Sequence, residues 1–550
     1  MKKNKKRILI LGAGLMQGPA IRAAKELGCE VIAVDGNPNA VCAKEADKFF
    51  PIDLKDIPAL IDLAKSLKEN GLHGVFTAAT DFSVSVAAVA ESCSLPGHSL
   101  EAARRASDKV LMRKCFEKHG VPSPKFTHIF KNEIDKALQI LKQKAIPFPI
   151  TVKPADNMGA RGCRLVYSQD ELRPALEDAV NFSRSGKAIA EEFIDGEEFS
   201  LEALVINGEI FLNALADRHI FFPPYFVEMG HTIPSIKSKE ECDELIRVFF
   251  LGIKALGLTN GAAKGDIFLR KADPQKNGKR TACVGEIAAR LSGGYMSGWT
   301  VPYSSGFDVT KAAVKIALGE PVDELPKDGA ARFSAERAWI SVPGIIKKIY
   351  GLEEARSTKN MKDVLPRLFE KDETVFPKNN VEKCGNVLSS AESYDEAVKA
   401  SMEAVQKIFL RLERANNKTN LFFEKTNPSI AVQGNYPPNF FKFPEDDSTK
   451  EIKNKTFDEL LKNSILAEED EILYPSFFKD FLDRAFDVHG LSIREAIKQA
   501  FFLEPKLKEK MLSLQTIGEP LNPSLVLWWK YFIRGSRQGL IYYLDTELNG

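Results

Sequence analysis

Short hydrophobic runs alternate with amphipathic segments along the first hundred residues of the chain. Arg7–Leu11 and Glu30–Val34 have the composition of buried strands, and the segment Gly18–Leu27 between them predicts a helix. A second helix is predicted near Ile57–Asn70. Because strands and helices alternate, we expect an open parallel sheet with covering helices, which is a Rossmann-like domain at 1–106.

The loop after the first strand resembles part of a dinucleotide-binding fingerprint. A G-x-G-x-x-x-G pattern begins at Gly12, and Asp35 follows the second strand, where an acidic residue binds ribose in NAD sites. The glycine spacing differs from G-x-G-x-x-G, so an NAD site is the weaker interpretation. Asp81, after a strand at Gly74–Ala78, is either a substrate contact or a helix N-cap.

A glycine-containing hairpin is predicted at Ile150–Val166. The β-branched run Ile150–Val152 places Lys153 at the end of a strand, and a loop with Gly159 and Gly162 leads into the next strand. The N–H groups of such a loop, together with a lysine beside it, suit the phosphates of a nucleotide. An ordinary surface hairpin is the alternative for this stretch alone.

Two later strands each carry one acidic residue. Gly261–Leu269 and Thr281–Ala288 are predicted strands joined by the polar hairpin KADPQKNGKR, and they contain Asp266 and Glu286. An unpaired charge on a core strand is costly. Paired carboxylates on neighbouring strands suit Mg²⁺ that bridges nucleotide phosphates, and two outward-facing, solvated acids are the alternative.

Composition and charge narrow the classes of function. Lys and Arg number 76 against 75 Asp and Glu, and the net charge of +1 gives no reason to expect nucleic acid or a membrane surface as partner. The 8 cysteines are scattered, without Cys-x-x-Cys, which argues against zinc and favours a reduced, cytoplasmic compartment. No apolar stretch approaches the roughly 18–20 residues of a membrane span. We expect the basic start, MKKNKKRILILGAGLM, to form the first strand instead of a signal peptide.

At 550 residues the chain is too long for one core, so several domains are expected. The predicted division is a Rossmann-like domain at 1–106, a linker and small lid subdomain at 107–200, a large subdomain at 201–415, a linker or ordered wrap at 416–450 and a mostly helical extension at 451–550. The fold class is α/β (α+β). The helical extension has apolar faces but no role that the sequence identifies.

Five separated motifs together resemble the ATP-grasp superfamily of ligases, with carbamoyl-phosphate synthase, biotin carboxylase and L-amino-acid ligases as similar members. In chain order they are DKVLMR with GVPSP, VKPADNMGARG, EEFIDGEEFS, GD and GEIAARLSGG. Their order and spacing over about Lys5–Arg414 make the resemblance specific. It implies a Rossmann-like domain before a two-subdomain ATP-grasp core, with ATP and one or two Mg²⁺ ions, or Mn²⁺, as cofactors.

The resemblance also implies site residues. Lys153 and Arg290 are the implied catalytic residues, and a permanent planar charge suits Arg290 to stabilise a transferring phosphoryl group. The implied cofactor-binding residues are Lys109, Lys153, Gly159, Arg161, Gly162, Glu191, Glu192, Phe193, Ile194 and Glu198. Asp266 and Glu286 are the implied metal ligands. Many relatives have Asn where this chain has Ala288, so the completeness of a second metal site is in doubt.

Candidate substrate residues lie in two places. The segment Ala214–Ser235 is irregular and aromatic, and we expect it to be a substrate-facing loop with Arg218, Glu228 and His231 as contacts. A lone histidine is more often structural than functional. The turn at Ser292, Gly293 and Gly294 is expected to bring backbone donors to the substrate carboxylate.

The implied reaction is the ATP-dependent activation of a carboxylate as an acyl phosphate and its joining to an amine, with release of ADP and phosphate. The expected partners are therefore a small-molecule carboxylate and an amine, and a homodimer is a candidate assembly. A bicarbonate-using carboxylase or a carbamoyl-phosphate-synthase-like enzyme is one alternative. A nucleotide-binding regulator that has lost its chemistry and an NAD oxidoreductase are the others. The sequence leaves the carboxylate and the nucleophile open.

Overall fold

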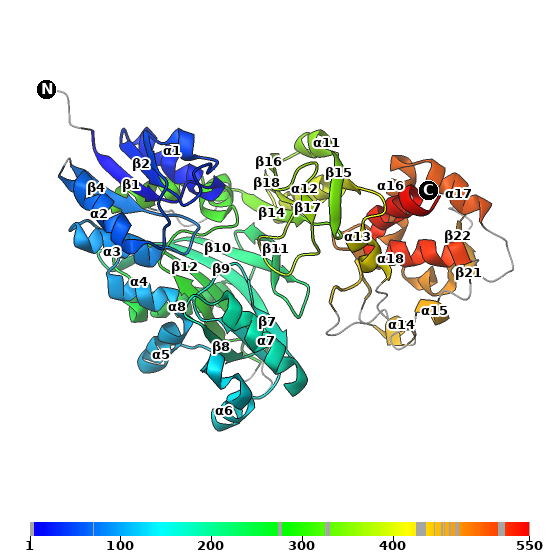
Figure 1. Ribbon diagram of the computed structural model, residues 1–550, viewed down its shortest axis with the longest axis horizontal. Coiled ribbons are helices and arrows are strands. Elements are labelled where there is room, and N and C mark those ends of the chain that lie inside the picture. Colours follow the sequence, from blue (N-terminus) through cyan, green and yellow to red (C-terminus); the bar gives the residue numbers. More distant parts are fainter. Residues whose placement is uncertain are drawn as a thin grey trace. The chain divides into compact units, whose positions relative to one another are not determined.

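The computed structural model describes residues 5–69, 71–272, 278–323, 325, 331–424, 436–444, 446–450, 452, 455, 457–460, 464–467, 472–514 and 523–548. The chain forms two compact units (Figure 1). The first comprises Met1–Ile220, Gly230–Glu336 and Ser389–Val398, and the second Phe221–Met229, Arg337–Leu388 and Lys399–Gly550. The five-part division expected from the sequence is finer than this and stays a prediction.

The first unit begins with a parallel sheet in the order β3-β2-β1-β4. The strands are β1 (Arg7–Leu11), β2 (Glu30–Val34), β3 (Lys48–Phe50) and β4 (Leu72–Phe76), and the covering helices are α1 (Gly18–Glu26), α2 (Ile57–Lys68), α3 (Ser83–Ser92) and α10 (Val309–Ala317). Ile8 and Ile10 face the core with α1 and α10, whereas Leu9 and Leu11 face the core with α2 and α3. The predicted sheet with helices on both faces is confirmed.

A second sheet, in the order β5-β8-β6-β7, carries the glycine loop. Its strands are β5 (Phe126–Phe130), β6 (Ile150–Pro154), β7 (Arg164–Val166) and β8 (Lys187–Glu192), and its helices are α6 (Ala137–Gln143) and α7 (Gln169–Phe182). Ile150 and Val152 pack beneath both helices. Ile150 pairs with Val166, which confirms the predicted hairpin.

The strands β13-β12-β9-β10-β11 are neighbours in the largest sheet. They are β9 (Gly196–Ile206), β10 (Glu209–Phe221), β11 (Val227–Ile233), β12 (Gly261–Arg270) and β13 (Ala282–Ala288). One face of β9 and β12, including Phe199 and Ile267, packs on two helices, α5 (Lys109–His119) and α8 (Lys239–Leu256). The other face of these strands carries ionisable side chains.

The structure corrects the expectation of a loop at Ala214–Ser235. Most of this segment lies in β10 and β11, and Ala214 and Ala216 pair with Glu202 and Ser200 of β9. Its prolines and aromatic residues interrupt the local pattern that predicts a strand. Backbone pairing with β9, which the sequence does not display, determines the conformation instead.

In the second unit, a sheet in the order β17-β15-β19 packs with helices α11 and α12. The elements of this part, including strands that cross the boundary between the units, are β14 (Phe333–Trp339), β15 (Gly344–Tyr350), α11 (Leu352–Arg356), β16 (Met361–Pro366), β17 (Glu373–Thr374), β18 (Gly385–Ala391), α12 (Tyr394–Lys407) and β19 (Phe409–Leu412). The sequence predicts a closing helix over Tyr394–Arg414, but helix α12 ends at Lys407. The residues after it, Phe409–Leu412, are mostly apolar and form β19, which pairs with β15.

The C-terminal part of the second unit has an aromatic core. Its elements are α13 (Asn417–Glu424), β20 (Phe441–Lys442), α14 (Asp447–Lys450), α15 (Phe457–Leu460), β21 (Ser464–Ala467), β22 (Ile472–Pro475), β23 (Phe486–Asp487), α16 (Ile493–Leu503), α17 (Lys506–Ser513) and α18 (Pro523–Tyr543). Phe422, Phe423, Phe440 and Phe441 are buried in this core, which favours an ordered wrap over a flexible linker. Within the ranges described, no helix combines the length and hydropathy of a bilayer span.

Helices alone do not account for the C-terminal extension. The apolar period predicts a helical face at Phe457–Leu466, but α15 ends at Leu460, and β21 and β22 form an antiparallel hairpin. The period also predicts a helical face at Phe477–Phe486, where the structure has a short 3₁₀ helix and a turn that lead into β23. Residues 273–277 of the predicted hairpin KADPQKNGKR and 425–435 of the predicted linker lie outside the described residues.

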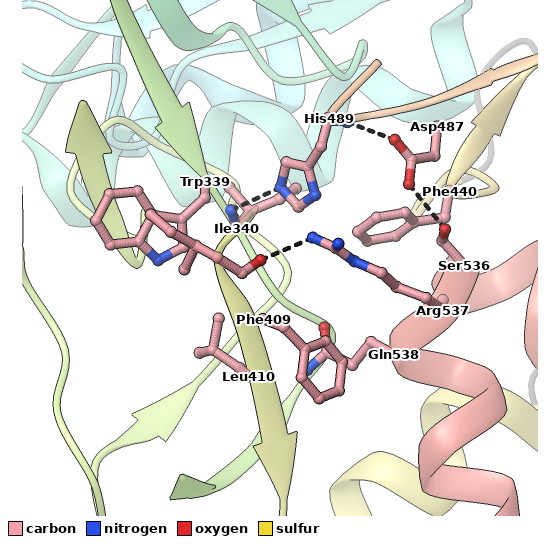
Figure 2. Close-up of a pocket in the computed structure, with 12 residues that line it drawn as sticks. Trp339, Ile340, Phe409, Leu410, Phe440, Asp487, His489, Ser536, Arg537 and Gln538 are labelled. Carbon is pink, nitrogen blue, oxygen red and sulfur yellow. Dashed lines mark hydrogen bonds between the residues drawn. The ribbon is translucent and has the colours of Figure 1, made fainter. Parts of the chain in front are cut away.

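Helix α18 is kinked at Ser536, which has φ 51° and ψ −144°. The Ser536 hydroxyl donates to Asp487 Oδ2 at 2.7 Å (Figure 2). Beside this pair lies a cavity of about 10 Å³, enough for one water molecule. From the sequence alone, Arg534 and Arg537 are candidate contacts for an acidic substrate. Both are buried and donate to backbone carbonyls, so they anchor this helix.

Candidate functional site

The polar face of β9, β12 and β13 gathers acidic side chains from three strands. Asp266 of β12 lies opposite Ser200 of β9 and Glu286 of β13. Directly opposed residues of antiparallel strands share a face, so the two carboxylates lie side by side. The neighbouring position on β12 is Lys264, which lies opposite Ala288. Strand alternation therefore brings the two predicted metal ligands together.

Cationic side chains surround Asp266. Lys264 Nζ forms an ion pair with Asp266 Oδ1, and Arg218 NH1 lies 2.6 Å from the same oxygen. Arg218 also forms an ion pair with Glu198. Arg218 was predicted as a substrate contact, and the structure places it between Glu198, an implied cofactor-binding residue, and Asp266, an implied metal ligand.

Lys109 lies at the start of α5 and reaches the second carboxylate. Asp108 caps this helix by accepting hydrogen bonds from Val110 N and Leu111 N, which fixes the direction in which the first turn points. Lys109 Nζ lies 3.2 Å from Glu286 Oε1 and donates to the carbonyl oxygen of Asn157. Burial raises the pKa of Glu286, but the Lys109 ammonium offsets this, and the pKa lies below its usual value. Glu286 is therefore ionised at neutral pH.

Lys153 pairs with Glu191 across the small sheet. Lys153 Nζ lies 2.9 Å from Glu191 Oε2, and Arg113 Nε lies 2.7 Å from Glu191 Oε1. Burial raises the pKa of Glu191, yet the cations Arg113 and Lys153 lower it to about 2. Burial also lowers the pKa of Lys153, but Glu191 raises it above its usual value. The Glu191 carboxylate therefore orients Lys153, and the cofactor contact implied for Glu191 stays a prediction.

Arg113 received no role from sequence reasoning. It is the last residue of the motif DKVLMR, and its place in that motif is the signal by which the sequence could have identified it. Its side chain is 1% exposed, which makes it one of the largest fully buried side chains of the chain. It also donates to the carbonyl oxygen of Gly285, next to Glu286. Arg113 thus links the small sheet to the strand that carries a predicted metal ligand.

The glycine loop has the backbone conformation that its sequence predicts. Gly159 and Gly162 have φ of 70° and 67°, values that side chains disfavour. At Gly162, a Cβ atom would lie 2.9 Å from Phe182. Arg161 Nε donates to the carbonyl oxygen of Met158. The loop therefore has no side chain at Gly159 and Gly162, the two positions that adopt this conformation.

Three implied cofactor-binding residues, Glu192, Phe193 and Ile194, lie at the end of β8 and directly after it. Glu192 Oε1 lies 3.0 Å from Arg270 NH1, so this carboxylate is held against β12. Phe193 and Ile194 follow the strand, and Ile194 is buried. The structure thus places Glu192, Phe193 and Ile194 between the small sheet and β9. Their contacts with a nucleotide stay a prediction.

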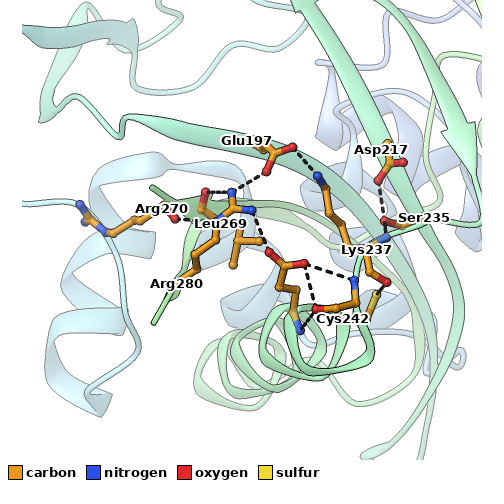
Figure 3. A network of polar contacts seen from close by, with 10 residues as sticks. Glu197, Asp217, Ser235, Lys237, Cys242, Leu269, Arg270 and Arg280 are labelled. Carbon is orange, nitrogen blue, oxygen red and sulfur yellow. Dashed lines mark hydrogen bonds and ion pairs between the residues drawn. The ribbon is translucent and has the colours of Figure 1, made fainter. Parts of the chain in front are cut away.

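A network of ion pairs holds the outer ends of β9 and β12 (Figure 3). Lys237 Nζ lies 2.5 Å from Glu197 Oε1, and Arg280 also pairs with Glu197. Arg280 NH1 lies 2.8 Å from Glu241 Oε1 at the start of α8. Exposed ion pairs contribute little free energy individually. Here they connect the hairpin after β12 with β9 and α8, and so support the strands that carry the site.

The turn after β13 is held by a buried carboxylate. Glu202 Oε2 accepts from the backbone N–H of Ser292 at 2.6 Å and from the Ser297 hydroxyl, and Glu202 Oε1 accepts from Asn213. In the described part of the chain, two buried atoms near this turn, Arg290 Nε and Ser292 Oγ, lack a hydrogen-bond partner. Unpaired buried donors of this kind suit a ligand with anionic oxygens.

Glu202 is a residue that sequence reasoning missed. Its signal is an acidic residue inside the apolar run SLEALVI. The turn it holds also touches the first domain, because Ala79 N donates to the carbonyl oxygen of Leu291 at 3.3 Å. At Gly293, a Cβ atom would lie 3.5 Å from Ala79. The predicted turn at Ser292, Gly293 and Gly294 is therefore packed against the end of β4.

His231 lies in a buried polar network. His231 Nε2 lies 2.6 Å from Thr300 Oγ1, and His231 Nδ1 lies 3.2 Å from Glu336 Oε2. His231 and Glu336 are 2% and 1% exposed, which favours the structural role over substrate contact. Glu228 belongs to the second unit, where its backbone N–H donates to Asn380. The contacts of His231 and Glu228 with a substrate stay predictions.

The glycine turn of the first domain is filled by the chain itself. Gln17 Oε1 accepts from Gly14 N, and Gln17 Nε2 donates to the carbonyl oxygen of Ala78. A Cβ atom at Gly12 would lie 2.9 Å from the Gln17 side chain. Asp35 Oδ2 accepts from Ala13 N. Because side chains occupy the place where a dinucleotide pyrophosphate would lie, the geometry weighs against the NAD alternative.

The residues of the polar face fit a nucleotide with a divalent cation. Mg²⁺ is usually bound in proteins by one or two carboxylates together with substrate phosphates, and Asp266 and Glu286 supply two. Lys109, Lys153 and Arg290 supply the cations that phosphates require. The roles of these residues stay predictions, but the structure brings them into one site.

Comparisons with known proteins match three segments of the chain. Residues 106–291 match the model of the ATP-grasp domain, residues 21–97 match the ATP-grasp N-terminal domain, and residues 338–413 match the L-amino acid ligase C-terminal domain 2. The matched segments include Lys109, Lys153 and Arg290 but none of the aromatic C-terminal core after 413.

Two curated relatives are sections of a larger enzyme. The C-terminal section of the carbamoyl phosphate synthase large chain of Methanocaldococcus jannaschii is 28% identical over 371 residues, which cover 62% of this chain and 55% of the relative. The corresponding section from Aquifex aeolicus is 24% identical over 384 residues, which cover 64% and 65%. The matches thus span less than two thirds of each relative.

Solved structures show a similar fold. An L-amino acid ligase from Bacillus licheniformis aligns with a TM-score of 0.66 and 22% identity, covering 75% of this chain and 100% of that chain. Phosphoribosylglycinamide synthetase from Anaerococcus prevotii aligns with a TM-score of 0.57 and 24% identity, covering 74% and 100%. At these identities the likeness establishes the fold alone.

Proposed function

We propose that this protein, whose residues 106–291 form an ATP-grasp domain, is an ATP- and Mg²⁺-dependent ligase that joins a small carboxylate to an amine. The observation that carries the proposal is the convergence of Lys109 and Arg113 on the strand of Glu286, with Asp266 directly opposite Glu286. Cations for phosphates and carboxylates for a metal ion therefore meet on one sheet face.

The side chains divide the work of binding ATP. Lys109 and Lys153 contact the phosphates, and Glu191 keeps the Lys153 ammonium charged and in place. The loop at Gly159–Gly162 covers the phosphates with its N–H groups. Glu198 accepts from the ribose hydroxyl groups, for which an ionised acceptor is well suited. Mg²⁺, when bound by Asp266 and Glu286, neutralises phosphate charge.

Arg290 and the turn after it handle the reacting groups. A carboxylate oxygen of the substrate attacks the γ-phosphorus, ADP leaves, and the acyl phosphate is then attacked by the amine, with release of phosphate. The Arg290 guanidinium lies where charge develops on the phosphoryl oxygens, and its unpaired Nε–H is available to them. The Ser292 hydroxyl donates to the substrate carboxylate. The protein thus contributes positioning and charge, with no covalent nucleophile.

The experiment is an assay of ADP and phosphate release by the full chain with ATP and Mg²⁺. Pools of amino acids and other small carboxylates, each with and without added amines, serve as substrates. ADP formed with one pool, together with a condensed product found by mass spectrometry, supports the ligase. AMP as the product overturns the acyl-phosphate mechanism. No nucleotide binding at all overturns the ATP site.

A second candidate uses bicarbonate as the carboxylate. The 28% identity to a section of carbamoyl phosphate synthase favours it, whereas the match of residues 338–413 to an L-amino acid ligase domain favours an organic carboxylate. ADP release that bicarbonate alone stimulates identifies this second reaction. A regulator without chemistry predicts ATP binding without turnover in every pool. The cytoplasmic location, the homodimer and the use of Mn²⁺ stay predictions.

A further inference from the structure

We propose that the ammonium group of Lys264 takes the place of a second divalent cation, so that the site binds ATP with a single Mg²⁺ ion. This inference rests on the proposed function, because it concerns the metal content of the same ATP site. It follows from what lies next to the two carboxylates on the sheet face.

The register of three strands places Lys264 beside the two predicted metal ligands. Lys264 lies directly opposite Ala288 of β13 and Glu202 of β9, one side-chain position along the face from the pair Asp266 and Glu286. Successive side chains of a strand point to opposite faces of the sheet, so residues two apart lie on the same face. Lys264 and Asp266 therefore project from β12 on the same side. Ala288 has no side-chain oxygen that could bind a metal ion, and it is 4% exposed. The residue that faces Ala288 across the strands is therefore a lysine, and neither residue is a metal ligand.

The ammonium group is already engaged with a predicted metal ligand. Lys264 Nζ forms an ion pair with Asp266 Oδ1, and both side chains are largely buried, at 15% and 16% exposed. Arg218 NH1 lies 2.6 Å from the same oxygen. A fixed positive charge within a few ångströms repels a divalent ion strongly where water is scarce. A second Mg²⁺ would therefore have to displace Lys264 from Asp266.

One Mg²⁺ remains compatible with the site. Asp266 and Glu286 lie side by side across β12 and β13, and Mg²⁺ typically needs only one or two carboxylates when phosphates complete its octahedron. A second ion would neutralise negative charge of the phosphates and of Asp266. The Lys264 ammonium group, which is part of the chain, neutralises that charge instead. The enzyme would then saturate with one ion for each bound nucleotide.

The test counts Mn²⁺ ions by electron paramagnetic resonance with a non-hydrolysable ATP analogue on the full chain. We expect one Mn²⁺ per analogue-bound chain in the wild type. In Lys264→Met, loss of the ammonium group should raise the number toward two at the same free Mn²⁺ concentration. Lys264→Arg keeps the charge and should keep one ion. Lys239→Met is the matched control, because Lys239 pairs with Asp243 on the surface and is 87% exposed.

The outcomes separate this inference from the proposed function. Two Mn²⁺ ions in the wild type, or one ion in both the wild type and a folded Lys264→Met, overturn the role of Lys264 while ATP binding stands. A wild-type count of two overturns the inference whether or not Lys264→Met folds. Thermal unfolding shows whether Lys264→Met is folded, and its Mn²⁺ count is compared with that of the wild type only if it is. Absence of analogue binding in the wild type overturns the proposed function and this inference together.

Discussion

The Glu202 carboxylate accepts a hydrogen bond from the backbone N–H of Ser292 at 2.6 Å, deep within the first unit. Glu202 is 0% exposed, and it also accepts from Ser297 and Asn213. The bond joins the middle of β9 to the turn that follows Arg290. The placement of the predicted phosphoryl-stabilising arginine therefore depends on a residue that the sequence motifs leave without a role.

Glu202→Gln should lower turnover and leave ATP affinity almost unchanged. The amide retains the shape but loses the charge that strengthens the bond to Ser292 N, a loss of about 1.5–3 kcal/mol and hence roughly 10- to 100-fold in rate. Steady-state kinetics and a separate measurement of ATP binding check this. Glu209→Gln, at the exposed start of β10, is the control. Equal losses in turnover and affinity would contradict a role limited to the turn.

Lys153→Ala should weaken ATP binding by about 10- to 100-fold, since a charge-assisted bond to phosphate is lost. The fold should survive, because Glu191 keeps its second partner, Arg113, at 2.7 Å. Isothermal titration calorimetry gives the affinity, and thermal unfolding verifies the fold. Lys239→Ala, on the surface, should change neither quantity. Unchanged ATP affinity in Lys153→Ala would remove Lys153 from the phosphate site.

Arg290→Lys should reduce turnover far more than ATP affinity. Lysine keeps the positive charge but not the planar fork that contacts two phosphoryl oxygens at once. We expect a loss of about 100-fold or more in turnover, in line with the removal of one transition-state donor. Single-turnover kinetics at saturating ATP isolates this step. If Arg290→Lys instead lowers affinity and turnover by the same factor, Arg290 acts only in binding.

Glu191 should make the stability of the first unit sensitive to acid. Burial raises the pKa of this carboxyl, but Arg113 and Lys153 lower it from 4.5 to about 2. A lowered pKa in the folded state contributes stability above pH 4.5, and this contribution falls as the pH drops toward 2. The shift corresponds to about 3 kcal/mol.

Urea unfolding of the wild type and of Glu191→Gln from neutral pH to pH 2 measures how the free energy of unfolding depends on the charge of Glu191. The variant should be less stable near neutral pH, because Arg113 and Lys153 lose their partner, and the difference from the wild type should shrink below pH 4.5. Glu177→Gln removes an exposed ion pair on α7 and should show no such convergence. A constant difference at all pH values would show that the charge of Glu191 is not responsible.

Ser536 offers a test of the C-terminal core in the second unit. Its φ of 51° is unfavourable for a side chain, and its hydroxyl donates to the buried Asp487. Ser536→Ala keeps the strain and leaves the carboxylate without this donor, so we expect a loss of about 1–3 kcal/mol in unfolding free energy. Ser536→Gly loses the same donor but relieves the strain, so it should be the more stable variant. The reverse order in thermal unfolding would contradict this account.

The sequence by itself determined the elements whose pattern is local. Short hydrophobic runs predicted β1 and β2, and glycines with β-branched neighbours predicted the hairpin that carries Lys153. The order of five motifs predicted the ATP-grasp fold, which the comparisons confirm. These features are readable because each depends on residues close together in the chain.

Only the tertiary structure decided which charges meet. Arg113 and Lys153 converge on Glu191, and Lys264 stands opposite Ala288, because strands and helices distant in sequence pack in one register. For the same reason, most of Ala214–Ser235, which was expected to be a loop, forms β10 and β11. A carboxylate on a strand looks alike in the sequence whether it faces solvent, a lysine or a metal. Burial and cross-strand pairing, which depend on the whole fold, make the distinction.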